Sequence, residues 1–461
     1  MYGSHNNYSI PIPKKLLLRT GLVMIEMCIL IWLQEIRYTE NMRIRKPAAK
    51  GPDDYRRRLM EKIKLGISLY PEQESREDIE NYLKLASEHG FEKVFTSLFS
   101  VEGDRDDLIP YFKELTDLAH KYGMVVSGDC NGPLFKRLGA KEDDLSVFRE
   151  MGLDILRMDG PFNDERDIIL VNNNDGLKIE FNASMSDLTQ KIIDGGGNPD
   201  NILTCHNFYP QRYTCPSFEA VNETNEKLKK QNISTAMFLS SQVKGTHGPW
   251  PVSDGLPTIE EHRDIPVESQ LKHMIAMDNV SEAIFGNAFA SPEEFEKISR
   301  TMADTYRDVS DVSADDPFFG DMVSEWIPDG KIRTIPFKIH LDPNISEIEK
   351  QDLFEYPIHM DMGDCMNYML RSRFGRMLYK GHEFKPRPYD QDMFKKGDVV
   401  IVNDNCKHYA GEVQIVMKDM KNDGQRNFAG HIDEDELMIL DSIRPMDMYG
   451  FVEAEEETSG N

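Results

Sequence analysis

With 461 residues, of which 39% are hydrophobic, the chain can bury a large core and is long enough for a second domain beside one barrel of ordinary size. Its 80 acidic residues against 54 lysines and arginines give a net charge of -26, which leaves no basic stripe for phosphates and argues against nucleic acid as a partner. The six cysteines lie far apart without a CxxC pair, so they fit a reducing compartment better than a disulfide framework or a structural zinc site.

The first sixty residues do not share the pattern of the rest. Residues 16–36 are apolar, as a signal anchor or membrane helix would be, but three ionisable side chains interrupt the run. Ionisable groups are costly in lipid, so a membrane anchor is kept only as the less favoured alternative. The three arginines at 56–58 precede Met60 as a translated ribosome-binding site would. We therefore interpret residues 1–60 as an extension that is not native or is disordered, with Met60 as the natural start.

Between Lys64 and Ser291 one pattern recurs eight times: a short apolar run that ends on polar residues, followed by a stretch with helical periodicity. The runs are KLGISLYPE, KVFTSLFS, MVVSGDCN, DILRMDGPF, LKIEFNAS, ILTCHNFYP, STAMFLSSQ and EAIFGNAFAS. This alternation is typical of a (β/α)8 barrel, which carries its chemistry at the C-terminal ends of its strands. We predict an α/β fold with a TIM-barrel catalytic domain over residues 61–311.

The stretches between these runs carry helix signals. Ser75 is a good N-cap for the first amphipathic stretch, and Pro292 suits the first turn of the last one. Turn residues at 172–175 predict a short helix after the fourth run. A long Gly/Pro-rich loop at 243–257 predicts a lid or specificity loop over the site. Helices are expected over residues 76–90, 106–122, 186–195, 218–231 and 292–306.

After Val312 the helical periodicity fades. Runs such as KIRTIPFKIHL, DVVIVN and EVQIVMKDM alternate polar with apolar residues and are separated by turns such as Asp423-Gly424. This pattern predicts a smaller all-β domain over residues 312–452. Residues 453–461 form an acidic tail that we expect to be disordered.

Several segments, taken in order, resemble a known family. GISLYPE, DILRMDGPF, IEFNAS, CHNFYPQRYT, GLPTIEEHR and GNAFAS, and later KKGDVVIVNDNCKHYAGEVQIV, look like the bacterial 6-phospho-N-acetylmuramidases, once called outer surface proteins. The resemblance runs from about Lys62 to Phe451. It implies a TIM barrel followed by a cyclophilin-like β domain. The sequence departs from the family at Cys215-Pro216, where a Gly-Leu pair is expected, and this affects the shape of the loop.

The same resemblance implies an activity and a compartment. Members of this family hydrolyse the β-1,4 glycosidic bond of the intracellular disaccharide of N-acetylglucosamine and N-acetylmuramic acid 6-phosphate during peptidoglycan recycling. The expected partner is therefore a small-molecule phosphodisaccharide, the expected location is the cytoplasm, and no cofactor or metal is expected. Formation of a homo-oligomer is left open.

Side-chain alternation along the strands places polar groups together. Arg157 and Asp159 share one face of the fourth strand, and Lys178, Glu180 and Asn182 share one face of the fifth. Charged groups are expensive to bury without a purpose, so we expect these five to point into the barrel mouth. By the same count, the first and third strands contribute Ser68, Tyr70, Glu72, Ser127, Asp129 and Asn131.

Glycoside hydrolysis needs two carboxyl groups, one to protonate the leaving oxygen and one to act as nucleophile or to activate water. We predict Asp159 and Glu180 as this pair, with Asp129 and Glu72 as substitutes. The alternative is an ion-pair layer with Arg157 and Lys178 that only fills the barrel. Acid and base are not assigned, and retention, inversion and substrate-assisted attack by the acetamido group all stay open.

Substrate binding needs fixed donors and stacking groups. For the phosphate we predict Arg212, Lys244, His247 and the Gly286-Asn287 pair, in the region where many barrels hold phosphate. Arg371 and Arg373 of the second domain are candidates for the lactyl carboxylate, and Phe208 and Trp250 for stacking on sugars. The full set of predicted substrate-binding residues is Tyr70, Glu72, Arg157, Lys178, Asn182, His206, Asn207, Tyr209, Arg212 and Asn287.

Two other classes of function compete with a glycosidase. The first is a phosphosugar aldolase or isomerase, with Lys178 as a Schiff-base lysine or with a metal held by Asp159, Glu180 and His206. The second is a non-catalytic sugar-binding or surface protein whose cyclophilin-like part contacts partners. We expect no peptide-isomerase activity there, because a shared fold does not carry function.

Overall fold

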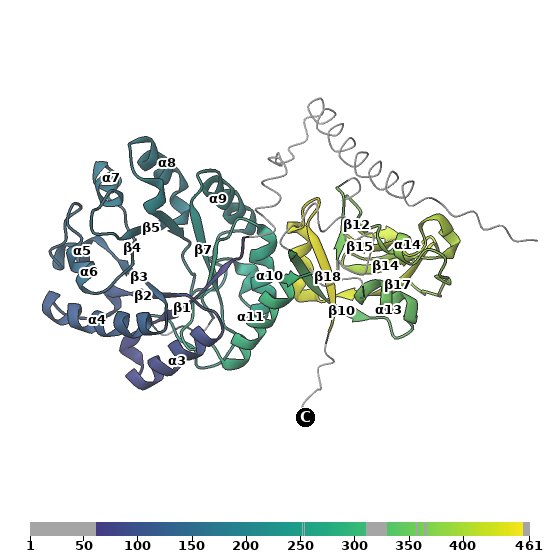
Figure 1. Cartoon of the computed structure of the whole chain (residues 1–461), viewed down its shortest axis with the longest axis horizontal. Helices are drawn as coiled ribbons and strands as arrows, with labels where there is room; N and C mark the ends of the chain where they lie inside the picture. Colours follow the sequence, from purple (N-terminus) through teal and green to yellow (C-terminus); the bar gives the residue numbers. More distant parts are fainter. Residues whose placement is uncertain are drawn as a thin grey trace, which may run out of the picture. The chain divides into compact units, whose positions relative to one another are not determined.

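The computed structural model describes residues 61–250, 252, 254–309, 330–355, 358–363 and 367–454 (Figure 1). The predicted extension at 1–60, with its apolar run at 16–36, lies outside the described residues. Almost all of the predicted acidic tail lies outside them too. Within the described part of the chain, no helix is both long enough and apolar enough to span a membrane.

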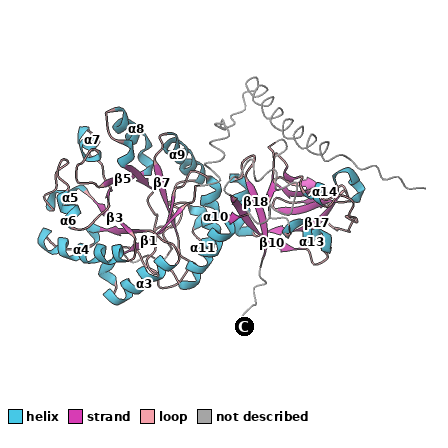
Figure 2. Cartoon of the chain, in the orientation of Figure 1, coloured by secondary structure: helices cyan, strands magenta, loops and turns pink. Residues whose placement is uncertain are grey.

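Eight parallel strands form a closed barrel in which each strand pairs with the next and β8 pairs with β1 (Figures 1 and 2). This confirms the predicted TIM barrel, and each of the eight apolar runs contains one strand. The strands are β1 (Lys64–Leu69), β2 (Lys93–Ser97), β3 (Val125–Cys130), β4 (Ile155–Met158), β5 (Lys178–Asn182), β6 (Ile202–Cys205), β7 (Ser234–Leu239) and β8 (Glu282–Phe285).

Helices connect the strands and surround the barrel (Figure 2). The side chain of Ser75 caps the first of them by accepting from the Asp78 amide, and Ser291 with Glu294 forms a capping box on the last. The bounds are α3 (Arg76–Glu88), α4 (Arg105–Lys121), α5 (Gly132–Arg137), α6 (Ser146–Glu150), α7 (Glu165–Val171), α8 (Ser186–Asp194), α9 (Phe218–Lys230), α10 (Val267–Met277) and α11 (Pro292–Thr305).

The second domain is mostly sheet, with strand order β11-β18-β10-β17-β14-β15-β12 and β9 paired to β10. Side chains join the two ends of this order, because His359 Nδ1 lies 3.0 Å from Ser372 Oγ and the Arg371 amide donates to Asp361 at 2.7 Å. The domain is thus barrel-like with a seam, as the predicted cyclophilin-like fold requires. Its strands are β9 (Tyr306–Asp308), β10 (Lys331–Leu341), β11 (His359–Met360), β12 (Met369–Ser372), β13 (Met393–Phe394), β14 (Asp398–Val402), β15 (Val413–Val416), β16 (Met420–Lys421), β17 (Arg426–Ile432) and β18 (Met448–Glu453).

This domain is mostly sheet, as the alternating pattern predicted. Its described residues also include two short helices, α13 (Glu347–Phe354) and α14 (Gly375–Leu378). A capping box between Ser346 and Glu349 stabilises the start of α13. The helix therefore forms although its apolar residues show only a weak amphipathic pattern. Its sheet also includes β9, which precedes the predicted start of the domain at residue 312.

Charged contacts join the two domains at outer helices of the barrel. Lys272 of α10 donates to Glu436 at 2.6 Å, and both side chains are buried. Arg333 of β10 donates to Asp278, just after α10, also at 2.6 Å. Glu436 accepts from the Lys338 amide as well, so one buried carboxylate serves both domains.

Candidate active site

The C-terminal ends of β3, β4 and β6 bring an arginine together with two carboxyl groups. Arg157 donates through NH1 to Asp129 Oδ1 at 2.6 Å and through NH2 to Asn207 Oδ1 at 2.6 Å. The same NH1 lies 3.5 Å from Asp159 Oδ1. Asp129 and Arg157 are register partners on β3 and β4, so the parallel sheet itself sets this spacing.

The two carboxyl groups differ in their surroundings. Asp129 is 6% exposed, whereas the side chain of Asp159 is 42% exposed. Burial raises the pKa of Asp129 to about 6; Arg157 opposes this shift, while Asp159 and Glu180 add to it. Asp129 can therefore carry a proton close to neutral pH, and Asp159 remains open to solvent.

Glu180 lies within the barrel interior as part of an ion-pair layer. Its side chain is 1% exposed, accepts from Lys93 Nζ at 2.6 Å and from Ser127 Oγ at 3.1 Å. Lys93 also donates to Glu282 at 2.8 Å. Glu180 Oε2 is 4.0 Å from Arg157 Nε, so the layer also contacts the arginine of the mouth. This arrangement matches the predicted alternative to catalysis by Glu180, with Lys93 as its main cation.

Aromatic rings form a wall beside this group. The Arg157 guanidinium lies 5.9 Å from the Phe95 ring centroid, and Phe95 meets Phe208 edge to face at 6.3 Å. Phe208 is in turn 6.4 Å from Trp250, whose side chain is 46% exposed. The wall therefore extends from the arginine to the surface.

Two family models match the chain. The model described as 6-phospho-N-acetylmuramidase, N-terminal, matches residues 65–300, and the one described as 6-phospho-N-acetylmuramidase, C-terminal, matches residues 335–452. The chain belongs to this family.

Solved structures are similar to this family member. A crystal structure described as an uncharacterized B. cereus protein is 33% identical, with a TM-score of 0.70, over 85% of this chain and 100% of that one. A conserved protein of unknown function from Enterococcus faecalis is 23% identical, with a TM-score of 0.57, over 86% of this chain and 97% of that one, and shares the fold. Comparison with curated proteins gives no match.

Lys178 of this family member does not point into the mouth, contrary to our prediction. Its ammonium donates to the Asp200 carbonyl at 2.7 Å and to Asn201 Oδ1 at 3.2 Å, just before β6. The alternation along β5 was read correctly, but Lys178 is the first residue of the strand and lies at its N-terminal end. The lysine of the barrel interior is instead Lys93, which shares its face of β2 with Phe95 and Ser97.

His206 also points away from the predicted site. Its Nε2 lies 2.7 Å from Asn225 Oδ1 on α9, and the ring is buried. Burial lowers its pKa to about 4, so it stays neutral. Cys205 packs against Phe95 and Phe238 inside the barrel, and the following residue therefore faces the helices.

Other predicted binding residues hold the loops at the same end of the barrel. The Tyr70 hydroxyl donates to the Gly286 carbonyl at 2.8 Å, and Asn182 caps the turn at Ser184. Asn287 Oδ1 accepts from the Ser241 amide at 3.1 Å, which ties the eighth loop to the seventh. The Tyr209 amide donates to the Pro257 carbonyl at 3.0 Å. Glu72 is exposed in the first loop.

The predicted phosphate ligands are dispersed. Arg212 donates to both oxygens of Asp264, and His247 Nε2 lies 2.8 Å from Glu74 Oε1. Lys244 is exposed in the seventh loop. Arg212 and His247 therefore have separate partners, and the phosphate position stays a prediction.

Arg371 and Arg373 were predicted to reach over the mouth, but the structure places both within the second domain. Arg371 donates to both oxygens of buried Glu412, at 2.6 and 3.0 Å, and Arg373 follows the same strand. The second domain contacts the barrel at Lys272 and Asp278 on its outer helices. Arg371 is thus held by Glu412 within the second domain, and its contact with the lactyl carboxylate stays a prediction.

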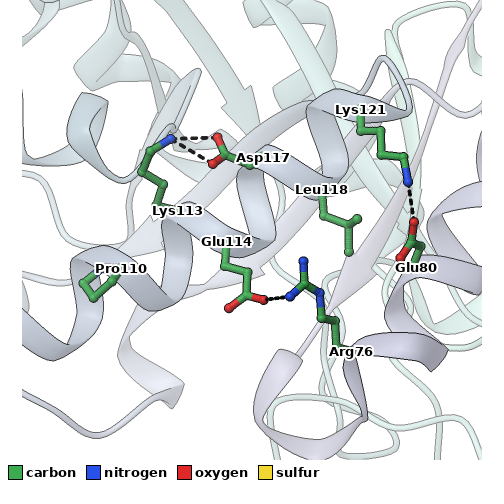
Figure 3. A pocket seen from close by; sticks show the side chains of 8 residues that line it. All are labelled: Arg76, Glu80, Pro110, Lys113, Glu114, Asp117, Leu118 and Lys121. Carbon is green, nitrogen blue, oxygen red and sulfur yellow. Dashed lines mark hydrogen bonds and ion pairs between the residues drawn. The ribbon is translucent and has the colours of Figure 1, made fainter.

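A groove on the barrel exterior, between α3 and α4, offers no competing site (Figure 3). Its charges neutralise one another, since Lys113 pairs with Asp117 at 2.7 Å and Lys121 with Glu80 at 2.5 Å, while Arg76 pairs with Glu114. These are exposed pairs of little energetic value. Across the described ranges, no group of three histidine, cysteine or acidic side chains is placed to hold a metal ion, and Asp159, Glu180 and His206 do not form one.

Because Asp129 is buried whereas Asp159 is exposed, we expect a shifted titration of Asp129 that can be measured. We expect carbon-13 NMR of the carboxyl groups to show Asp129 losing its proton near pH 6. In Asp159→Asn the midpoint should fall, because that change removes a negative charge that raises the pKa of Asp129. A wild-type Asp129 that titrates near pH 4, or a midpoint that rises in the variant, would contradict this account of the site.

Proposed function

We propose that this chain hydrolyses the β-1,4 glycosidic bond between N-acetylglucosamine and N-acetylmuramic acid 6-phosphate, as its family name implies, in the cytoplasmic recycling of peptidoglycan. The observation that carries the proposal is the pair of carboxyl groups, Asp129 and Asp159, which share the NH1 atom of Arg157 at neighbouring strand ends. One is buried with a raised pKa and the other is solvent-exposed, which are the properties that glycosidases assign to acid and nucleophile.

In the proposed reaction, protonated Asp129 donates its proton to the bridging oxygen as the bond from that oxygen to the anomeric carbon breaks. The carboxylate of Asp159 attacks the anomeric carbon from the other side, and water later releases the sugar while Asp129 takes up a proton. Arg157 contacts Asp159 and orients Asp129. Asn207 fixes the guanidinium from its other side.

The spacing of the two carboxyl groups supports retention of configuration. Both distances end on Arg157 NH1, at 2.6 and 3.5 Å, so the two Oδ1 atoms can be no farther apart than the sum of the two distances. Retaining enzymes hold their carboxyl groups about 5 to 5.5 Å apart, whereas inverting enzymes need roughly 6.5 to 9.5 Å. We therefore expect proton NMR to show the β-anomer as the first product, which also separates this route from inversion.

The decisive experiment compares substrates. We expect purified protein to cleave the 6-phosphorylated disaccharide, and to leave the unphosphorylated disaccharide essentially uncut under the same conditions. Both orders of the two sugars should be offered, because the bond direction is part of the question. The double variant Asp129→Asn/Asp159→Asn serves as the inactive control. Absence of cleavage of every phosphorylated disaccharide would rule out the proposal.

An aldolase that works through a Schiff base receives no comparable support. Such a lysine needs a lowered pKa. Burial by itself lowers the pKa of Lys93, but Glu180 and Glu282 outweigh it, so the pKa lies above its ordinary value. Lys178 is at the opposite end of its strand from the mouth. Sodium borohydride is therefore expected to trap no substrate on the chain.

A further inference from the structure

Tyr213 has the most exposed ring among the large apolar side chains in the described part of the chain. It lies in the loop between β6 and α9, and 83% of its surface is accessible to solvent. Its backbone is left-handed, with a φ of 66°. A bulky residue with positive φ is uncommon, and such residues gather at functional sites.

Neither packing nor local contacts explain a tyrosine at this position. An exposed ring contributes little burial energy, and a tyrosine adopts the left-handed backbone less favourably than glycine or asparagine does. The Arg212 guanidinium lies 6.0 Å from the ring centroid, at the outer limit of a cation–π contact. The fold would therefore be at least as stable with asparagine in place of Tyr213.

The backbone that carries this ring is firmly held. The Tyr213 amide donates to Glu260 Oε1 at 2.9 Å, and the Thr214 hydroxyl donates to the Gln211 carbonyl at 2.6 Å. Arg263 donates to the same Gln211 carbonyl at 3.2 Å and is itself buried. The ring is therefore presented to solvent by a fixed turn, which limits the entropy lost when a ligand binds.

The turn belongs to the same end of the barrel as the candidate active site. Its loop includes Asn207, which contacts Arg157, and Phe208 in the aromatic wall. The buried Arg263 also donates to the Asp254 carbonyl at 2.7 Å, in the loop that carries Trp250. One guanidinium therefore fastens the two loops that display Tyr213 and Trp250.

We propose that Tyr213 is a carbohydrate-binding residue, whose ring stacks on the apolar face of one pyranose of the substrate. This inference rests on the proposed function and adds a residue to its binding site. A phenol ring suits this role, because it offers a flat apolar face and few rotatable bonds. An N-acetylated amino sugar is the ligand class, since it presents axial C–H groups on one face and polar groups at its edge.

The test uses two variants of Tyr213. Tyr213→Asn keeps a residue that tolerates the left-handed backbone but removes the ring, and we expect KM for the phosphorylated disaccharide to rise about five- to tenfold with kcat little changed. The melting temperature should stay the same or rise. Tyr213→Phe, which retains the ring, should restore the wild-type KM. A residue with only a structural role would give the opposite result, a lower melting temperature with KM unchanged.

Phe289 supplies the matched control, because it is the other aromatic residue with a left-handed backbone in the described chain, with a φ of 65°. Its ring stacks on Tyr82 at 4.6 Å, so Phe289→Asn should lower the melting temperature, unlike Tyr213→Asn.

Binding is also measured without turnover, by saturation-transfer NMR of the disaccharide on Asp129→Asn with and without Tyr213→Asn. Weaker transfer with the second change supports the proposal, even if hydrolysis fails. Equal saturation transfer with and without Tyr213→Asn overturns the proposal, even if the chain cleaves the substrate. Contact with a protein partner would then be the remaining explanation for the exposed ring. Absence of sugar binding in every form overturns the proposal together with the proposed function.

Discussion

Replacing Asp129 with asparagine is expected to lower kcat for the phosphorylated disaccharide by about 10²- to 10⁴-fold, the usual contribution of a general acid. The amide oxygen of asparagine can still accept from Arg157 NH1, so the fold and KM should change little. The variant lacks the carboxyl proton that Asp129 donates to the leaving oxygen near neutral pH. The wild-type kcat/KM should fall about tenfold per pH unit above pH 6, as Asp129 deprotonates, and the variant should lose this limb.

A change of leaving group separates the two aspartates. The nitrophenolate group of a nitrophenyl glycoside of the same phosphorylated sugar leaves without protonation, so Asp129→Asn should regain most of the wild-type kcat/KM on it, because kcat/KM reports the first step alone. Asp159→Asn should stay slow on both substrates, because the nucleophile is needed whatever the leaving group. Equal losses on both substrates in the two variants would show that Asp129 is not the acid.

The barrel could be predicted from the sequence because the same pattern, an apolar run followed by a stretch with helical periodicity, recurs eight times in order. An error in one element would have left this repeat recognisable. The site was harder. Side-chain alternation placed Arg157, Asp159 and Glu180 on inward faces, as the structure has them. Alternation does not tell how far along the barrel axis a residue lies, which we call its height. For this reason Lys178 was assigned to the wrong end of the barrel. Height depends on the shear of the closed barrel, which no single strand records.

Long-range partners were also beyond the sequence. Lys93 begins an apolar run that reads as an ordinary strand, and only the closed barrel brings its ammonium to Glu180 and Glu282, both far along the chain. The inward alternation of Lys93 with Phe95 was the one signal that could have identified it. His206 directly follows the end of a strand, so it was predicted to lie in the mouth of the barrel. The sequence around Cys205 does not show that the next side chain faces the outer helices.

Removal of one partner of the buried ion pair between Lys93 and Glu180 is the second change with a large expected effect. Glu180→Leu leaves Lys93 buried with Glu282 as its remaining carboxylate, and we expect unfolding in urea to show a loss of about 3 kcal/mol or more. Hydrolysis should fall as well, because the disturbed ion-pair layer also contacts Arg157. Lys93→Met, Glu180→Leu and Glu282→Gln together remove all three charges of this layer and should recover most of the stability, since uncharged side chains fill the same interior.

This pair of variants decides between the two interpretations of Glu180. If Glu180 acts only through the barrel interior, the triple variant should recover hydrolysis together with stability. A triple variant that is stable but remains inactive would restore Glu180 to the catalytic pair that the sequence first suggested. Lys272→Met is the matched control, because it breaks an equally buried pair with Glu436 on the outside of the barrel. It should lower stability by a similar amount while kcat stays unchanged, which separates general destabilisation from an effect on the site.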